Sequence, residues 1–184
     1  MKMHPPTFIK SVFKGFSLIE LMVVLSIAAI LLAVGIPSFR SLIQNQRMTT
    51  NVNEFFAAIN LTRSAALERG VRVDMIAAGD GSDWKNGWII FVDKNNDRIR
   101  DSNEKLIFTH GPLPDGMSTT TNISDTPLAI GFLPMGFIKL AANQKGCTIS
   151  FAQEDEDKKR IKLSFIGRPR ICDAKDTTNC KAID

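Results

Sequence analysis

The hydrophobic residues of this chain follow three successive patterns, and each pattern predicts a different kind of element. A continuous apolar run, LMVVLSIAAILLAVGI, covers residues 21–36; with its flanks it corresponds to about 20 residues, or roughly 30 Å of helix. Beyond Pro37, apolar residues recur at threes and fours as far as about Arg69, which is typical of an amphipathic helix. After Gly70, a natural helix stop, short apolar runs alternate with turn residues and predict strands.

The apolar run is long enough to cross a bilayer. Residues 1–15 contain three lysines and no acid, so the positive-inside rule predicts that they lie in the cytoplasm and that the rest lies outside. Pro37 follows the run and is predicted to break or bend the helix.

A secretory signal peptide is the alternative interpretation, because Ala33-Val34-Gly35 is an acceptable cleavage site. Two features weigh against it. The run is longer than a usual signal core, and one acid, Glu20, lies in its first turns. A carboxylate inside a membrane helix costs about 2–4 kcal/mol, so Glu20 is expected to have a partner and a purpose.

The second half of the chain predicts an antiparallel sheet. The expected strands cover residues 71–77, 87–93, 104–109, 129–132, 136–140, 148–153 and 160–166, with turn-forming sequences between them. The predicted fold class is α+β, a long N-terminal helix packed on an antiparallel sheet.

Charge is informative only where it is local. The net charge is +4, but without residues 1–15 there are 20 basic and 19 acidic residues. The basic tail, residues 158–184, holds eight basic residues against three acids. Its first part belongs to a mixed run, residues 154–160, which is interpreted as a solvated hairpin tip without function.

Neither catalysis nor a cofactor is predicted. His4 lies near the start of the chain, His110 stands alone beside Gly111, and no Ser/His/Asp or Cys/His arrangement stands out.

Three cysteines, Cys147, Cys172 and Cys180, lie in the last quarter of the chain. In an oxidising compartment two of them would pair and one would remain. Spacing alone does not choose the pair, although the short loop between Cys172 and Cys180 favours that bridge. No CxxC or histidine cluster indicates zinc.

The segment from Asp93 to Glu104 has the spacing of a calcium loop. The candidate oxygen ligands are Asp93, Asn95, Asp97, Asp101 and Glu104. Arg98 occupies the position where the sharp turn requires glycine, and no helices flank the loop. The favoured interpretation is therefore a polar turn whose Asp and Asn side chains bond their own backbone.

The residues around Glu20 resemble a known signal. The segment from Gly15 to Leu21, GFSLIEL, resembles the class III signal of type IV pilins and pseudopilins. The resemblance implies that a prepilin peptidase cuts after Gly15, that the new amine of Phe16 is methylated, and that the hydrophobic helix stays in the mature protein. Glu20 would then attract the positive N-terminus of a neighbouring subunit in a filament, where an unpaired buried carboxylate is costly.

This resemblance also implies a division of the chain, a location and partners. The expected parts are a leader at 1–15, a transmembrane or filament-core helix at 16–37, its amphipathic half at 38–70 and a β-rich domain at 71–184. The protein would sit in the bacterial inner membrane with its domain in the periplasm, and later in a surface pilus. Its partners would be the prepilin peptidase and other minor and major pilins.

The tail carries a second resemblance. Gly167-Arg168-Pro169-Arg170 reads as a turn, and it resembles the GRxR motif of the FimT/FimU/GspH group of minor pilins and pseudopilins. FimT-like members bind DNA there during natural transformation, so the resemblance implies double-stranded DNA as a partner.

Two arginines on a stiff turn suit phosphate contacts without sequence preference. Lys162, Lys175 and Lys181 are expected to contribute more weakly. No aromatic residue follows Gly167, so base stacking is not predicted. A structural minor pilin or a type II secretion pseudopilin, priming assembly without binding DNA, remains the alternative.

Overall fold

The computed structural model describes residues 15–140, 144–154 and 156–180. The predicted leader, apart from Gly15, and Lys181 lie outside the described residues. The chain divides into two units, one ending at Gln44 and the other, here called the globular unit, formed by Asn45–Asp184.

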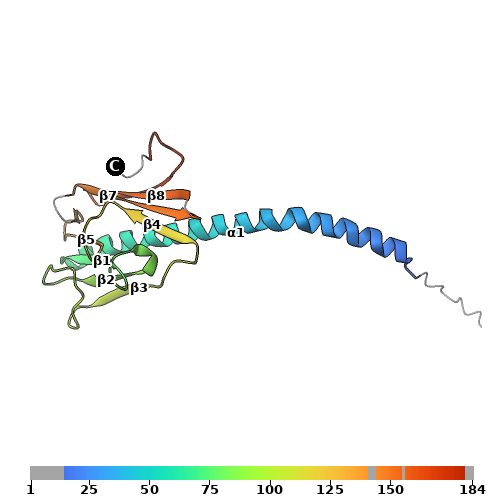
Figure 1. The fold of residues 1–184 in the computed structure, drawn as a ribbon. Coiled ribbons are helices and arrows are strands. Elements are labelled where there is room, and N and C mark those ends of the chain that lie inside the picture. The colour runs from blue at the N-terminus through green and yellow to red at the C-terminus, as the bar shows by residue number, and fades with distance from the viewer. Residues whose placement is uncertain (1–14, 141–143, 155, 181–184) are drawn as a thin grey trace, which may run out of the picture. The chain divides into compact units, whose positions relative to one another are not determined.

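One long helix, α1 (Leu18–Arg69), contains both predicted helical segments (Figure 1). It ends with Gly70 at φ +64°, and the Gly70 N–H donates to the Ala66 carbonyl at 3.0 Å. Of the predicted break or bend at Pro37, the break is wrong, since the helix continues through that residue. A proline removes one backbone donor, and the regular hydrogen bonds on either side maintain the helix.

The first part of α1 exposes its apolar side chains. Between Leu18 and Ile36 the large hydrophobic residues are at least half exposed. Within the described part of the chain, α1 is the one helix that is long and apolar enough to cross a membrane.

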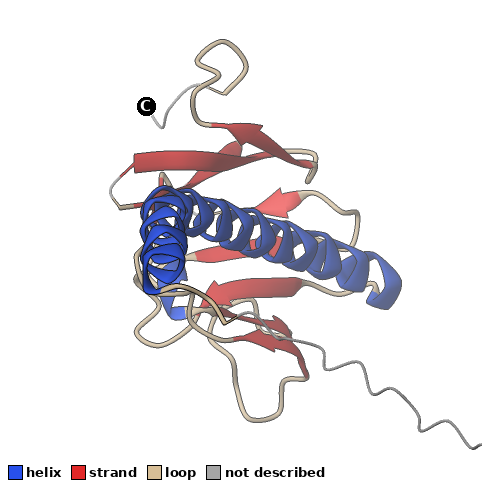
Figure 2. Cartoon of the chain, turned by 90° about the vertical axis from the view of Figure 1, so that its right-hand side faces the viewer, coloured by secondary structure: helices blue, strands red, loops and turns tan. Residues whose placement is uncertain are grey.

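The strands form two antiparallel sheets, drawn as arrows in Figures 1 and 2. The first has the order β3-β2-β1-β5-β6 and comprises β1 (Val73–Ala77), β2 (Trp88–Val92), β3 (Leu106–His110), β5 (Ala129–Phe132) and β6 (Ile138–Lys139). The second has the order β4-β7-β8-β9 and comprises β4 (Met117–Thr121), β7 (Gly146–Gln153), β8 (Glu156–Ser164) and β9 (Pro169–Asp173).

The predicted α+β class with antiparallel strands is confirmed, but the single predicted sheet is in fact two. Two strands were also not predicted. The β4 sequence MSTTT lacks apolar alternation. The β9 strand starts at a proline, which a sheet tolerates at an edge position.

Both sheets pack on the C-terminal part of α1 through one aromatic cluster. The ring of Phe55 on α1 lies edge-on to Trp84, Trp88 and Phe151, with centroids 5.1, 4.9 and 5.4 Å away. Trp84 lies in a short 3-10 helix, η1 (Trp84–Asn86), Trp88 in β2 and Phe151 in β7. The amphipathic face of α1 thereby closes the core between the two sheets.

A buried ion cluster joins the start of β1 to the residue after β2. Arg72 donates to both carboxylate oxygens of Asp74, at 2.8 and 2.6 Å, and its Nε lies 3.4 Å from Asp93. Burial is the main cause that raises the pKa of Asp74 to about 6, and the neighbouring charge of Asp93 raises it as well. The hydrogen bonds and the charge of Arg72 act in the opposite direction and lower this pKa. Two carboxylates share one guanidinium, which favours protonation of one of them.

This raised pKa predicts how stability depends on pH. The folded pKa of Asp74 exceeds its ordinary value of 3.8, so its contribution to stability is fully present below about pH 4 and is lost as the pH rises through about 6. Relative to an Asp74→Asn variant, the wild-type free energy of unfolding should therefore rise by on the order of 1–3 kcal/mol from about pH 7 to about pH 4. Tryptophan fluorescence during denaturant unfolding measures it, because both tryptophans lie in the globular unit. A constant difference between the two proteins would contradict the prediction.

Candidate nucleic-acid interface

The connection between β8 and β9 is a tight turn built around Gly167. Its N–H donates to the Ser164 carbonyl at 2.8 Å, and its φ is +76°. A Cβ at this position would lie 2.3 Å from the Gly136 carbonyl oxygen and 2.8 Å from the Phe132 ring. Only glycine fits this backbone conformation and this close approach.

The prediction that the whole motif is a turn is wrong, because β9 begins at Pro169. Arg168 immediately precedes β9 and Arg170 lies in it, and both line the same groove. The β8–β9 register places Lys162 directly opposite Arg170. Pairing therefore brings Lys162 to the arginines, as the sequence suggested.

These three cations line an open groove of about 640 Å³, here called the arginine groove. Its other lining residues are Asn122, Gly146, Cys147, Thr148, Leu163, Ser164 and Pro169. The described lining contains no acidic residue. Arg168 and Arg170 are exposed, so their guanidinium groups are accessible to a ligand.

Like charges directly opposite each other across two strands repel, so the pair formed by Lys162 and Arg170 is unfavourable without a bound anion. Among the residues that the structure describes, neither Lys162 nor Arg168 forms an ion pair. Arg170 donates to the Asn179 carbonyl at 2.6 Å. Hydrogen bonds from Asn179 lower the pKa of Asp176, and the nearby charge of Arg170 lowers it further.

A disulfide loop follows β9. Cys172 and Cys180 are bonded, with their Cα atoms 5.8 Å apart, while Cys147 is a buried free thiol whose pKa burial raises to about 12. Arg160 donates to the carbonyls of Ala174 and Cys180, at 3.2 and 2.7 Å, and so holds the loop against the sheet.

The assignment of Arg160 to a solvated hairpin tip is therefore wrong. Its side chain is buried and also bonds Ser150 and Asp157. The physical reason is that β9 and its loop cover the outward face of β8 at this position, which local alternation cannot show.

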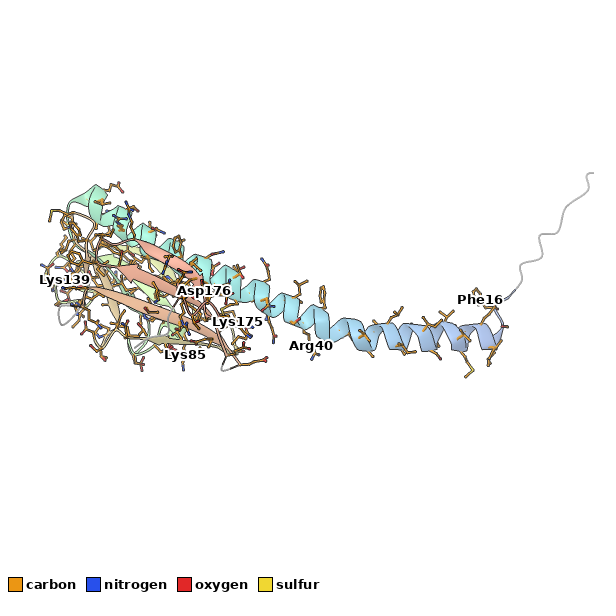
Figure 3. The ribbon with its side chains drawn as sticks, turned by 90° about the horizontal axis from the view of Figure 1, so that it is seen from above. Phe16, Arg40, Lys85, Lys139, Lys175 and Asp176 are labelled. Atoms are coloured by element: carbon orange, nitrogen blue, oxygen red, sulfur yellow. A yellow bond between two sulfur atoms is a disulfide. The ribbon has the colours of Figure 1, made fainter. Side chains whose placement is uncertain are left out.

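Lys175 does not join the arginine groove. Its Nζ lies 3.8 Å from a carboxylate oxygen of Glu156, which Lys158 also contacts. Figure 3 shows Lys175 beside Asp176, at the end of the globular unit opposite Lys139. The structure thus gathers Lys162, Arg168 and Arg170 and separates Lys175 from them.

The loop from Asp93 to Glu104 is a hydrogen-bonded polar turn. Asp93 accepts the N–H groups of Asn96 and Arg98, at 2.7 and 3.2 Å, and Glu104 accepts those of Lys94 and Asp101, at 2.7 and 3.1 Å. Arg98 adopts φ +66° where a calcium loop has glycine, and its guanidinium pairs with Asp125.

The side chains of the other candidate ligands bond one another. The Asn95 amide donates to Asp97 at 2.8 Å and to Asp101 at 3.1 Å. Among the described residues, no group of three His, Cys, Asp or Glu side chains is arranged to hold a metal.

The N-terminal end of α1 shows what Glu20 does in a single chain. The Glu20 carboxylate accepts the Ser17 N–H and hydroxyl, both at 3.1 Å, and the Glu20 N–H donates to the Ser17 hydroxyl at 3.2 Å. This reciprocal arrangement is a capping box. The S-x-x-E spacing was the available signal, and the sequence interpretation missed it. Glu20 therefore has an intramolecular partner at the helix start, close to Phe16, which Figure 3 labels.

The sequence matches two family profiles. The profile described as Type II transport protein GspH matches residues 51–167. This chain belongs to the GspH family. The prokaryotic N-terminal methylation motif matches residues 10–36 of this GspH-family chain, a range that includes Gly15, Phe16 and Glu20.

Solved structures share the fold of this family member. The minor pilin FimU of Pseudomonas aeruginosa is 15% identical with a TM-score of 0.56, and the match covers 76% of this chain and 98% of that one. The minor pseudopilin EpsH of the Vibrio cholerae type 2 secretion system is 12% identical with a TM-score of 0.51, covering 71% and 99%.

A sequence relative is the Prepilin peptidase-dependent protein D of Escherichia coli K12, which is 40% identical over 57 residues. That match spans 31% of this chain and 39% of the relative.

The GspH-family chain is thus a type IV pilin-like protein of the FimT/FimU/GspH group of minor pilins and pseudopilins. Membership implies other pilins and a prepilin peptidase as partners. The exposed apolar part of α1 is consistent with anchoring in a membrane and incorporation in a filament.

Proposed function

We propose that this protein is a minor type IV pilin that binds DNA without sequence preference through the arginine groove, for uptake in natural transformation. The observation that carries the proposal is the groove itself, where Lys162, Arg168 and Arg170 converge and no acid lies in the described lining. A surface that concentrates cations in this way suits a polyanion.

The chemistry of these residues favours the phosphate backbone as the ligand. Each arginine presents a planar guanidinium group that can donate two hydrogen bonds to phosphate oxygens. Lys162, opposite Arg170 on the neighbouring strand, adds a further positive charge. Such contacts position the nucleic acid without reading its bases. Asn122 and Thr148, which sequence reasoning did not single out, add polar groups to the wall of the groove.

The proposal includes a route to the filament. A prepilin peptidase cuts after Gly15, the amine of Phe16 is methylated, and the first part of α1 stays in the inner membrane with the globular unit in the periplasm. On assembly, Glu20 exchanges its bond to Ser17 for the terminal amine of a neighbouring pilin, because a charged partner stabilises a carboxylate in an apolar bundle more than a neutral one does.

The double variant Arg168→Gln/Arg170→Gln tests the DNA site. In the full chain purified in detergent, we expect its affinity for a short labelled duplex to fall at least about tenfold, because hydrogen bonds to charged groups are lost. The slope of log affinity against log salt should also decrease by about 2, since each phosphate contact contributes roughly 0.9. Fluorescence anisotropy over a salt series gives both values.

The matched control is Lys94→Gln/Arg100→Gln, which removes two exposed cations from the loop between β2 and β3 and should change affinity little. Wild-type protein that binds neither duplex nor single-stranded DNA, or a double variant that binds as well as the control, would refute the DNA proposal.

The alternative is a structural minor pilin or a type II secretion pseudopilin that primes assembly without contacting DNA. The GspH profile and the likeness to EpsH favour it as the second candidate. It predicts that the groove variant assembles normally and that wild-type protein has no measurable affinity for DNA.

A further inference from the structure

A second hollow lies beside the arginine groove, with a volume of about 240 Å³. It is lined by Ile138, Lys139, Leu140, Gln144, Lys145 and Phe165. Two lysines and one aromatic ring therefore face a space whose described lining holds no acid. The proposed function does not use any of these residues.

The linings of the two hollows are adjacent in sequence where β7 begins and β8 ends. Gly146 of β7 pairs with Ser164 of β8, and both line the arginine groove. The preceding residue, Lys145, and the following residue, Phe165, line the second hollow. The side-chain amide of Gln144 donates to the Asn122 carbonyl at 2.7 Å, which ties the two walls together.

The two hollows, together called the basic track, extend from the disulfide loop toward Lys139. One end is marked by Arg170, whose partner Asn179 belongs to that loop, and the other by Lys139. Figure 3 shows Lys139 at the opposite end of the globular unit from Lys175 and Asp176. The cations along the basic track are Lys139, Lys145, Lys162, Arg168 and Arg170.

Phe165 is held in place while about half of it remains in contact with water. The residue is 51% exposed, and its ring stacks on Phe137 with centroids 5.4 Å apart and planes 27° apart. Its carbonyl accepts the Ile138 N–H at 3.2 Å. The result is a supported aromatic surface beside a line of cations, the combination on which single-stranded nucleic acids stack and bind.

We propose that the basic track binds single-stranded DNA, with phosphates on the lysines and arginines and a base stacked on Phe165. The inference rests on the proposed DNA-binding function and narrows its substrate. In a duplex the base faces are covered by their neighbours and must be unstacked first, so an aromatic side chain reaches them at lower cost in an unpaired strand. Base stacking was not predicted from the tail, because Phe165 precedes the motif and the lysines come from other segments.

Phe165→Leu tests the stacking in the full chain, with an oligothymidine strand, an abasic strand of equal length and a duplex as probes. Wild-type protein should bind oligothymidine several-fold more tightly than the abasic strand. The variant should lose about fivefold or more on oligothymidine and change little on the other two probes, because it lacks only the aromatic face. Phe108→Leu is the matched control, since Phe108 is 39% exposed on β3 and lies outside the basic track.

The double variant Lys139→Gln/Lys145→Gln tests the path of the strand. For oligothymidine, the slope of log affinity against log salt should decrease by about 1.4, from roughly 0.7 for each lost phosphate contact. The variant Lys94→Gln/Arg100→Gln should leave that slope unchanged.

The outcomes separate this inference from the DNA proposal itself. Loss of binding in Arg168→Gln/Arg170→Gln, with Phe165→Leu and Lys139→Gln/Lys145→Gln both equal to wild type, would overturn the single-strand inference and leave the DNA function standing. Equal wild-type affinity for oligothymidine and the abasic strand would also overturn it. Wild-type protein without affinity for any of the probes would overturn both.

Discussion

Replacing Arg72 by glutamine should destabilise the globular unit by about 3–5 kcal/mol, because it leaves two buried carboxylates without their cation. Asp74 is fully buried, Asp93 is nearly so, and Arg72 contacts both. Glutamine can donate a hydrogen bond but cannot neutralise either charge. Denaturant unfolding followed by tryptophan fluorescence gives the difference.

The pH dependence identifies the cause. Protonation of Asp74 relieves the uncompensated charge, so the defect of Arg72→Gln should shrink as the pH falls from about 7 to about 4. Adding Asp74→Asn should recover part of the stability at neutral pH. Arg69→Gln, an exposed change at the end of α1, is the control and should stay within about 0.5 kcal/mol of wild type. A defect of Arg72→Gln that is independent of pH would exclude this electrostatic explanation.

Replacing Gly167 by alanine should both destabilise the protein and disturb the arginine groove. The left-handed conformation costs a non-glycine residue about 1–2 kcal/mol, and the new Cβ would lie 2.3 Å from the Gly136 carbonyl oxygen, which must move. Overpacking of this kind adds about 1–3 kcal/mol. We expect a total loss of about 2–5 kcal/mol in the free energy of unfolding and a weaker affinity for DNA, because the turn positions Arg168.

Gly116→Ala separates the cost of the left-handed backbone conformation from the cost of the close contact. Gly116 also has a positive φ, +82°, but its added Cβ would meet only the Gln153 side chain at an ordinary 3.7 Å. This control should show the cost of the backbone conformation alone and should retain DNA binding. If both variants lose the same stability and bind DNA equally, close packing of the turn is not what positions Arg168.

The sequence predicted those parts of the candidate site whose residues are close together in the chain. Gly167, Arg168 and Arg170 stand together in one motif, and the alternation along β8 assigns Lys162 to an outward face. Lys175, which the sequence analysis also placed among the contributors, does not line the arginine groove; its Nζ lies 3.8 Å from Glu156, nineteen residues earlier. Lys139, Lys145 and Phe165 were missed because they come from three segments. Lys145 and Phe165 meet where β7 pairs with β8, and β6, which carries Lys139, is joined to them where the Ile138 N–H donates to the Phe165 carbonyl.

The sequence by itself determined the long apolar helix with its acid at residue 20, the amphipathic continuation, the α+β class and the arginine motif. Each of these follows from periodicity or spacing within one segment, where the local geometry of helices and strands dictates which side chains share a face. The tertiary structure alone decided that the strands form two sheets, that Arg160 is buried beneath the disulfide loop, that Gly167 packs on Gly136 and that the residues lining the second hollow come together. These features depend on register between segments far apart in the chain, which is set by the competition of many packing and hydrogen-bonding arrangements and not by any one stretch of residues.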